Sequence, residues 1–339
     1  ARILEVQSQF VQTRADRFPM VGLDAKAQRD KRPIIGILPT GSFSVKTDTH
    51  TLSLPASFEL DLWGKLARAE EAAQADLLRA EENFLTVVQT IAAETANLYL
   101  LMESYERRIQ ITEESINNFK ESFALVERRY RRGLASVLDL KQASRILSEA
   151  ETVLPSLRQE LGITQQKLAV LMGQYPKTRA PRAQPEDYFR LLDPVPPGLP
   201  SELLLSRPDI RAAEANLRAL NARIGVAKAS RFPKITLTGN FGYSSEELND
   251  LFEPESELWG VAAGVTQPVF DAGKLKAGQQ AAEARYEQGL SQYAQTVLTA
   301  FAEVETALLT RKEQLEHRDR VLRFLKDARS VQNFAQTRY

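Results

Sequence analysis

The sequence predicts a mainly α fold with β, in which long coiled-coil helices alternate with pairs of strands and the arrangement is present twice. Three observations predict this fold class: a motif that recurs along the chain, apolar residues at heptad spacing, and four short stretches in which apolar and polar residues alternate. Heptad spacing is typical of helices that pack side by side, and a period of two is typical of strands with one apolar face.

The chain contains an internal duplication. Arg231-Phe232-Pro233 recurs near the N-terminus as Arg17-Phe18-Pro19, and Trp63-Gly64-Lys65-Leu66 recurs as Ala272-Gly273-Lys274-Leu275. A repeat of roughly 200 residues is too long for a solenoid unit and indicates two fused copies of one topology. Each copy is expected to contain a helix, a Phe-Pro turn, a strand pair and a very long helix.

The composition excludes several classes of protein. The 339 residues carry 44 basic and 44 acidic side chains, so no nucleic acid partner is expected, because phosphate binding needs a clustered basic surface. No cysteine is present, which excludes thiolate metal sites and cysteine nucleophiles within these residues. No run of 18 apolar residues exists, which excludes a transmembrane helix but leaves a transmembrane β-barrel open.

The first strand pair follows the first Phe-Pro motif. Residues 1–16 are expected to end a helix and residues 17–61 to form the strand pair, because the residue before a proline is disfavoured in a helix. The alternating stretches of both pairs cover residues 21–27, 52–60, 235–243 and 259–269.

Residues 62–173 are expected to form a helical hairpin that turns near Gly133. Two apolar stripes with alternating steps of three and four run along it: Val88, Ile91, Thr95, Leu98, Met102, Tyr105, Ile109, Thr112, Ile116, Phe119, Phe123, Val126 and Tyr130, and then Leu140, Ala143, Leu147, Ala150, Leu154, Leu157, Leu161, Thr164, Leu168 and Leu171. Such stripes predict coiled-coil packing. The charged residues between them, including Glu103 and Glu106, are expected to form a solvated face.

The second copy follows a proline-rich segment at residues 174–207, which is expected to be irregular. A helix is expected at 208–231, the second strand pair at 232–271, and a long helix at 272–339 without its return helix. The proline at the start of the 208–231 helix is tolerated in a first turn.

Four strands cannot close a barrel, and an open edge in a bilayer would leave backbone groups unsatisfied. If the strands enter a membrane, the chain must oligomerise, and three copies would supply 12 strands, an even number within the range of known barrels. The same alternation also fits a soluble sheet on a core, so both interpretations remain open.

Several motifs resemble the outer-membrane factor family, the TolC-like exit ducts of Gram-negative efflux pumps, and in particular the branch that serves resistance-nodulation-division pumps. The resemblance covers nearly the whole chain. Its most specific segments are Leu199-Pro200-Ser201, Arg207-Pro208-Asp209-Ile210, Asn221-Ala222, Phe232-Pro233, Glu59-Leu60-Asp61-Leu62-Trp63-Gly64 and Arg129-Tyr130-Arg131-Arg132-Gly133-Leu134.

This resemblance implies a homotrimer in the bacterial outer membrane that extends into the periplasm. Long helical hairpins would form a trimeric α-barrel joined to a 12-stranded transmembrane β-barrel, with an equatorial collar at 174–207. The implied partners are a periplasmic adaptor protein, an inner-membrane pump and outer-membrane lipid. Family members also carry a further N-terminal segment, often with a lipid-modified cysteine.

The implied function is passive conduction of drugs or other small toxic compounds to the exterior as part of a tripartite efflux system. The alternative is a periplasmic coiled-coil adaptor or structural protein without a membrane barrel. We expect no enzymatic activity, because no nucleophile, metal or phosphate-loop constellation is apparent, and no cofactor or metal is expected.

Two groups of candidate site residues follow. Arg131, Arg132, Gly133 and Asp139 lie at the expected tip, where the resemblance implies a gate or adaptor contact, although solvated turn charges explain them equally well. Phe18, Pro19, Phe232 and Pro233 are expected to form hinges between helix and barrel, mainly because proline ends the helix and begins the strand.

Overall fold

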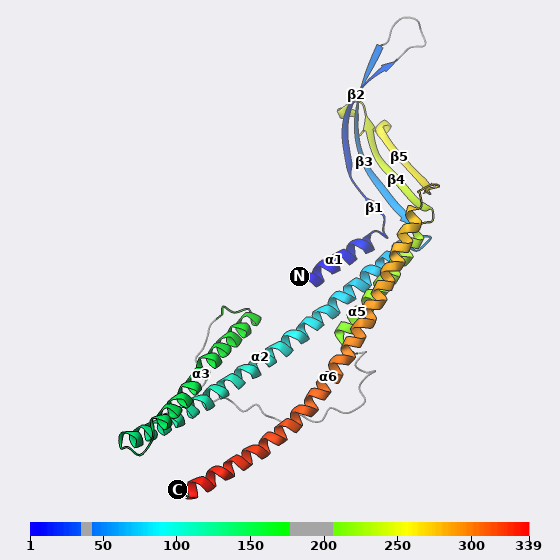
Figure 1. Cartoon of the computed structure of the whole chain (residues 1–339). Coiled ribbons are helices and arrows are strands. Elements are labelled where there is room, and N and C mark those ends of the chain that lie inside the picture. The colour runs from blue at the N-terminus through cyan, green and yellow to red at the C-terminus, as the bar shows by residue number, and fades with distance from the viewer. Residues whose placement is uncertain (35–42, 177–205, 339) are drawn as a thin grey trace. The chain divides into compact units, whose positions relative to one another are not determined.

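The protein is described by a computed structural model that covers residues 1–34, 43–176 and 206–338 (Figure 1). Its chain divides into two compact units, Ala1–Phe84 with Leu199–Tyr339, and Leu85–Gly198. Most of the expected irregular segment at 174–207 lies outside the described residues.

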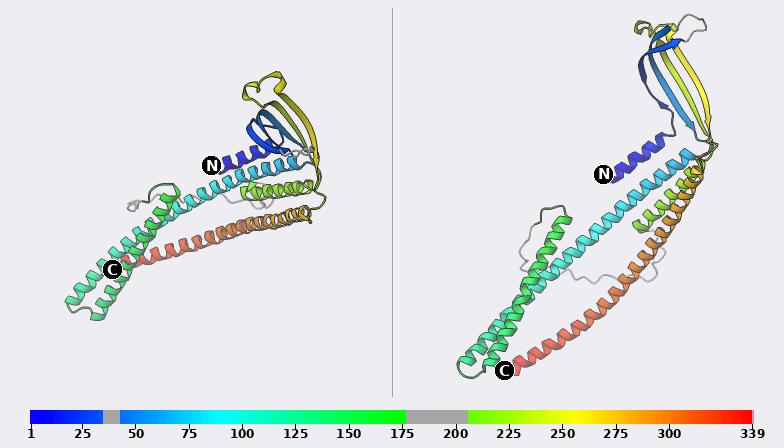
Figure 2. Two further views of the ribbon diagram at one scale, coloured as in Figure 1. Left: turned by 90° about the horizontal axis from the view of Figure 1, so that it is seen from above. Right: turned by 45° about the horizontal axis from the view of Figure 1, so that its top comes forward.

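The first unit contains one antiparallel sheet (Figures 1 and 2). Its strands run in the order β1, β3, β4, β5, and β2 pairs with β3 in line with β1. The strand bounds are Met20–Val21 for β1, Asp24–Ile34 for β2, Phe43–Leu60 for β3, Lys234–Ser245 for β4 and Glu257–Thr266 for β5. Two short 3-10 helices, Leu248–Asp250 and Pro254–Ser256, connect β4 to β5.

The first strand pair is longer than the alternating stretches predicted. β2 continues through the charged residues after Ala27, and β3 begins before His50, so the two strands pair from Asp24↔Ser53 to Ile34↔Phe43. The alternation of apolar and polar residues does not reveal this extension of β2 and β3, because polar residues lie on both of its faces. The backbone ladder and an ion pair between Arg29 and Asp48 (2.5 Å) hold it instead.

The break between β1 and β2 has a covalent cause. Gly22 donates its backbone N–H to the carbonyl oxygen of Pro55 (2.9 Å), but proline has no N–H to donate in return. The register is the same on both sides, from Val21↔Ala56 to Asp24↔Ser53. The two segments therefore form one strand with a missing rung, and the sheet has the four strands that the sequence predicts.

The helices of the first unit leave the sheet at one end (Figure 1). They are α1 (Arg2–Ala15), the start of α2 (Lys65–Arg131), α5 (Pro208–Ala229) and α6 (Lys274–Arg338). Their buried residues are mostly alanines, including Ala72, Ala215, Ala219, Ala222 and Ala282. Small side chains let helix axes approach closely; a Cβ on Gly289 of α6 would lie 2.4 Å from Leu220 Cδ1 of α5.

The second unit is the helical hairpin expected from the heptad stripes. The remainder of α2 packs against α3 (Val137–Leu171), and the two stripes meet in a core of Ile109, Leu157 and Leu161, with Met102, Tyr105 and Leu154 beside it. Residues far apart in the sequence thus interdigitate as coiled-coil packing requires.

The expectation that Glu103 and Glu106 belong to a solvated face is wrong. Their side chains are buried, with relative exposures of 6% and 3%. Each directly follows a stripe residue, Met102 or Tyr105, so the buried strip is wider than the stripe itself. Glu103 accepts a hydrogen bond from the guanidinium of Arg107 (2.9 Å), which is how a carboxylate tolerates this position.

Helix α2 also contains a stretch of 18 residues whose composition would suit a membrane span, of which only 6% is buried in the single chain. One such stretch is weak evidence, because a helix that packs in a core can pass the same test. What it does show is a long apolar helix surface that the single chain leaves uncovered. Phe84, Val88 and Ile91 are among the exposed residues.

A two-faced sheet, its hinges and the helical tip

The register of the sheet separates apolar from polar side chains. Residues directly opposite one another share a face, so Leu54, Phe241 and Trp259 lie on one face together with the row Ala56, Gly239 and Val261. The apolar face is open to its surroundings: the relative exposures are 75% for Trp259 and 81% for Val261. An apolar surface of this extent needs lipid or protein to cover it.

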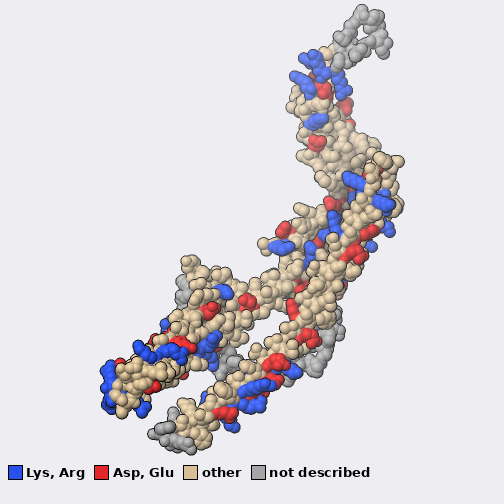
Figure 3. Space-filling view, viewed as in Figure 1, with Lys and Arg blue, Asp and Glu red and all other residues tan. Residues whose placement is uncertain are grey.

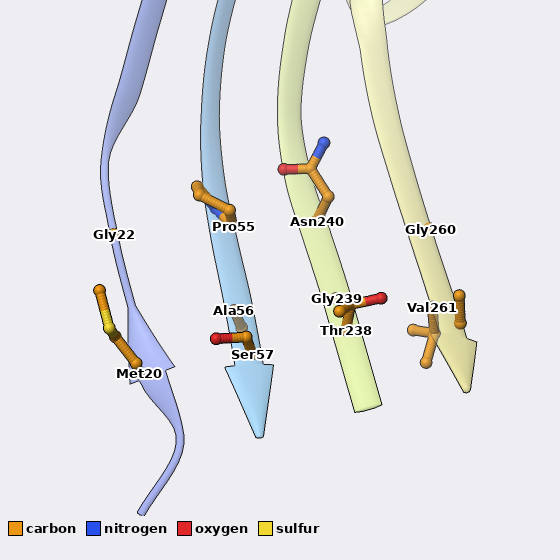
Figure 4. Close-up of a pocket in the computed structure, with 11 residues that line it drawn as sticks. Met20, Gly22, Pro55, Ala56, Ser57, Thr238, Gly239, Asn240, Gly260 and Val261 are labelled. Carbon is orange, nitrogen blue, oxygen red and sulfur yellow. The ribbon is translucent and has the colours of Figure 1, made fainter. Parts of the chain in front are cut away.

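The opposite face carries small and polar residues and is concave. It holds a hollow of ≈ 630 Å³ whose lining includes Met20, Gly22, Ser57, Thr238, Asn240 and Gly260 (Figure 4). These six belong to the polar face by the register, while Ala56, Gly239 and Val261, which also line the hollow, alternate with them on the same strands. A curved sheet with an apolar outside and a small, polar inside is the wall of a water-filled barrel.

One position on the concave face has room for nothing larger than glycine. A Cβ on Gly242 would lie 2.3 Å from the carbonyl oxygen of Leu52 and 2.6 Å from Ser53 Cα. By contrast, a Cβ on Gly260 would meet no atom within 4 Å. The absence of a side chain at Gly242 thus lets β4 approach β3 closely at Leu52 and Ser53.

The second predicted hinge is held by a contact between the two repeats. Phe232 stacks on Trp63 with ring centroids 4.8 Å apart, and the indole Nε1–H of Trp63 donates to the carbonyl oxygen of Pro233 (2.8 Å). The first hinge lacks this clamp, because Ala272 occupies the repeat position that corresponds to Trp63. Phe18 is accordingly 60% exposed in the single chain.

Each long helix is capped where it leaves the sheet. The carboxylate of Asp61 accepts the backbone N–H of Ala67 (2.7 Å), and that of Asp271 accepts those of Gly273 and Leu275 (2.9 Å each). The N–H of Leu275 and then that of Gly273 hold the pKa of Asp271 below its usual range. Both repeats therefore use an aspartate to cap the long helix, although Asp61 and Asp271 stand one position apart in the alignment of the repeats.

The helical tip has a well-defined turn. Gly133 has a φ of +72°, and the N–H groups of Gly133 and Leu134 donate to the carbonyl oxygens of Tyr130 (2.9 Å) and Arg129 (2.8 Å). This is the Schellman arrangement, in which glycine supplies the left-handed conformation that ends a helix. The turn lies where the sequence predicts it.

Two of the predicted gate residues, Asp139 and Arg131, have side-chain partners within the chain. Asp139 and Ser136 form a capping box: the Asp139 N–H donates to Ser136 Oγ (3.1 Å), and the Ser136 N–H donates to the Asp139 carboxylate (2.9 Å). The Ser136 N–H and then the Ser136 hydroxyl, which donates to the same carboxylate oxygen (2.8 Å), hold the pKa of Asp139 below its usual range. Arg131 pairs with Glu127 (2.8 Å), and Arg132 completes the exposed basic turn. The structure gathers these residues at one tip but does not test a gating role.

Sequence reasoning missed a series of ion pairs that join the helices of the first unit. Arg17, in the turn after α1, pairs with Glu70 of α2, and two arginines of α5, Arg223 and Arg211, pair with Asp76 and Glu82 of α2. The Arg207 guanidinium bridges Asp209 and Glu303 (2.7 Å each), which lowers the pKa of Asp209. Each carboxylate looks like an ordinary helix-surface residue in the sequence, and only the helix packing reveals its partner.

The described ranges contain no group of three or more His, Asp or Glu side chains with the geometry of a metal site.

Comparison with known proteins gives a consistent result. A profile described as "Outer membrane efflux protein" matches residues 1–174 and 199–339. The chain is 35% identical over 326 residues to the outer membrane protein OprJ of Pseudomonas aeruginosa, covering 94% of this chain and 66% of OprJ. It is 32% identical over 345 residues to the cation efflux system protein CusC of Escherichia coli, covering 100% and 72%.

Solved structures share the fold. The outer-membrane channel OprN matches with a TM-score of 0.87 and 29% identity, covering 93% of this chain and 70% of that one. A structure of CusC matches with a TM-score of 0.83 and 31% identity, covering 92% and 71%. The fold class expected from the sequence, long helical hairpins joined to a strand-paired barrel wall, is confirmed.

The chain spans about two thirds of the length of its curated relatives, 66% of OprJ and 63% of the solvent efflux pump protein SrpC of Pseudomonas putida. The match to the family profile nonetheless covers both repeats, including the sheet, the hinges and the tip. This chain belongs to the outer membrane efflux protein family.

Proposed function

We propose that the full-length protein is a passive outer-membrane channel that conducts small toxic compounds from an inner-membrane pump to the exterior. The observation that carries this proposal is the two-faced sheet, whose exposed apolar face suits lipid and whose concave face suits water. Its relatives are named as efflux and channel proteins, which supports the same proposal.

The proposed assembly is a homotrimer. Within the described strands, β5 pairs only with β4 and β2 only with β3, so both edges of the sheet are open. Open edges in hydrocarbon are not viable, and closure with further copies is the remaining solution. Three copies would give a 12-stranded barrel, with the exposed apolar surface of α2 covered by neighbouring helices.

The proposed partners bind at the helical tip. Arg131, Arg132, Gly133 and Asp139 would form the contact with a periplasmic adaptor or the gate, while Phe18, Pro19, Phe232 and Pro233 would set the angle between helix and barrel. The intrachain bonds of Asp139 and Arg131 leave the second oxygen and the remaining N–H groups for such contacts. The adaptor in turn would link the channel to the pump.

The cargo is set by the pump rather than by this chain. Relatives of similar identity are named for solvent efflux, cation efflux and pyoverdine export. The concave hollow offers small side chains and few charges, which select poorly among small solutes. We therefore propose small toxic compounds as a class.

The alternative of a soluble periplasmic coiled-coil protein is disfavoured by the sheet. Trp259, Val261 and Val265 would lie in water on one face with no core to cover them. A soluble sheet would bury this face instead.

The test is purification of the full-length protein from outer membranes, followed by mass measurement in detergent and conductance in planar bilayers. A trimer with a stable water-filled conductance supports the proposal, as does increased sensitivity to toxic compounds in a strain that lacks the gene. A detergent-independent monomer without conductance would overturn it.

A further inference from the structure

The β2–β3 hairpin projects beyond the rest of the sheet. β3 pairs with β4 only from Leu60↔Ile235 to His50↔Ser245, whereas β2 and β3 continue together to Ile34↔Phe43. The projecting part is rich in basic side chains (Figure 3). It lies on the far side of the sheet from the helices (Figure 1).

Two lysines on this hairpin oppose each other directly. Lys31 pairs with Lys46 in the register, both are exposed, and no carboxylate of a described residue lies within 4.0 Å of either ammonium group. Like charges in opposite positions of a ladder destabilise it. The nearest pair along the same face, Arg29 and Asp48, shows the arrangement that stability alone would favour.

These lysines continue the apolar face of the sheet. The alternation of β3 places Lys46 on the same face as Leu52 and Leu54, and the alternation of β2 places Lys31 on the face of Leu23. From the row of Trp259, an aromatic residue typical of a membrane interface, the face passes through the rows of Glu257 with Leu52 and of Arg29 with Asp48 before it reaches the two lysines. The lysines lie beyond this mixed band, on the side where an anionic headgroup layer would follow the hydrocarbon.

We propose that Lys31 and Lys46 form a site for the phosphate groups of an anionic glycolipid headgroup at the outer surface of the membrane. A phosphate placed between the two ammonium groups would relieve their repulsion and accept charge-assisted hydrogen bonds from both. The proposal rests on the barrel orientation proposed above. The sheet face that carries the two lysines would face outward from the barrel, away from the concave face that would conduct solutes.

The test uses full-length protein that has already shown trimeric mass and conductance, so that failure of the lipid site is distinguishable from failure of the channel. Native mass spectrometry measures the binding of diphosphoryl lipid A in detergent, and lipid A stripped of both phosphates is the chemical comparison. The double variant K31Q/K46Q should bind diphosphoryl lipid A about tenfold more weakly, because two charge-assisted contacts are lost.

The matched control is K26Q/R32Q. It removes the same charge from the same hairpin, but Lys26 and Arg32 belong to the opposite face by the alternation of β2. The control should bind lipid A like the parent protein, and K31Q/K46Q should unfold at an equal or higher temperature because a repulsive pair is removed. Equal losses in both double variants, or equal affinity of the parent for phosphorylated and stripped lipid, would overturn the proposal.

Discussion

Trp63 and Phe232 stack across the two repeats with ring centroids 4.8 Å apart, so a residue in the turn before the first long helix holds the turn into the second strand pair. Trp63 also donates a hydrogen bond to Pro233. The first hinge has Ala272 at the corresponding position and lacks this clamp. Both repeats therefore contain the Phe-Pro motif, but only the second Phe-Pro motif is held by a tryptophan.

Replacing Trp63 should loosen the second hinge. We expect Trp63→Phe to cost about 1 kcal/mol through the lost hydrogen bond and Trp63→Ala to cost about a further 1 kcal/mol through the lost stacking. Thermal unfolding of the purified full-length protein measures both. Phe18→Ala at the unclamped hinge is the control and should cost less; an equal or greater loss there would contradict the asymmetry.

Gly242 and Gly260 should respond differently to the same substitution. Gly242→Ala forces a Cβ into the backbone of β3 and should cost about 1–3 kcal/mol, or prevent insertion, because backbone atoms cannot yield as a flexible side chain can. Gly260→Ala meets open space and should be neutral or slightly stabilising. The folded fraction, read from gel mobility without heating, decides the matter. Similar behaviour of the two variants would show that the strand spacing at Gly242 is not limiting.

The capping box should govern the order of the helical tip. Ser136→Ala removes the acceptor for the Asp139 N–H and should cost about 1 kcal/mol of local stability, measurable as faster amide exchange in the first turn of α3. Ser115→Ala, an exposed mid-helix position on α2, is the control and should leave exchange at the tip unchanged. Unaltered amide exchange in Ser136→Ala would show that the capping box does not stabilise the first turn of α3.

The same cap predicts a pH dependence. Because the folded-state pKa of Asp139 lies below its unfolded value, the carboxylate stabilises the cap fully above about pH 3.9 and progressively less as the pH falls through the folded pKa. Amide exchange of α3 residues, corrected for its intrinsic pH dependence, should show protection lost on acidification. Asp139→Asn should abolish this acid-dependent component, and its persistence in that variant would assign it to another group.

The ion pair between Arg223 and Asp76 should be coupled more strongly than a surface pair. The Asp76 side chain is 16% exposed. In the surface pair, by contrast, the side chains of Arg145 and Glu149 are each about 70% exposed. A double-mutant cycle with Arg223→Met and Asp76→Asn should give a coupling energy of about 1–3 kcal/mol. The cycle at Arg145 and Glu149 should give at most about 0.5 kcal/mol. Equal couplings would mean that the α2–α5 contact is solvated.

Much of the fold could be predicted because periodicity reports directly on burial. The turn at Gly133, the four strands and the two Phe-Pro turns between helix and strand follow from heptad spacing, alternation and proline position. The length of the β2–β3 hairpin could not be predicted, because a ladder outside the core places no demand on side-chain polarity. The split of the first strand could be read only once Pro55 was known to face Gly22.

The candidate site was less accessible to sequence reasoning. Asp139 can be noticed in the sequence as a charged residue at a turn. The capping box that it forms with Ser136 could not be predicted, because it depends on the exact placement of Ser136. Glu82 and Glu103 are charged residues in helices that otherwise look solvated, and their burial depends on which helix packs beside them. Pairing across elements is tertiary information that a single sequence does not contain.

The two open edges of the sheet have a consequence for biogenesis. In the proposed homotrimer these edges are completed by other copies, and obligate oligomers of this kind often have no stable folded monomer, so stability would depend on the concentration of chains. Dilution should then act as a denaturant. Cells that make this protein slowly would need either to hold unassembled chains with a chaperone or to lose them to proteases, and expression level would set the yield of finished barrels more steeply than in proportion.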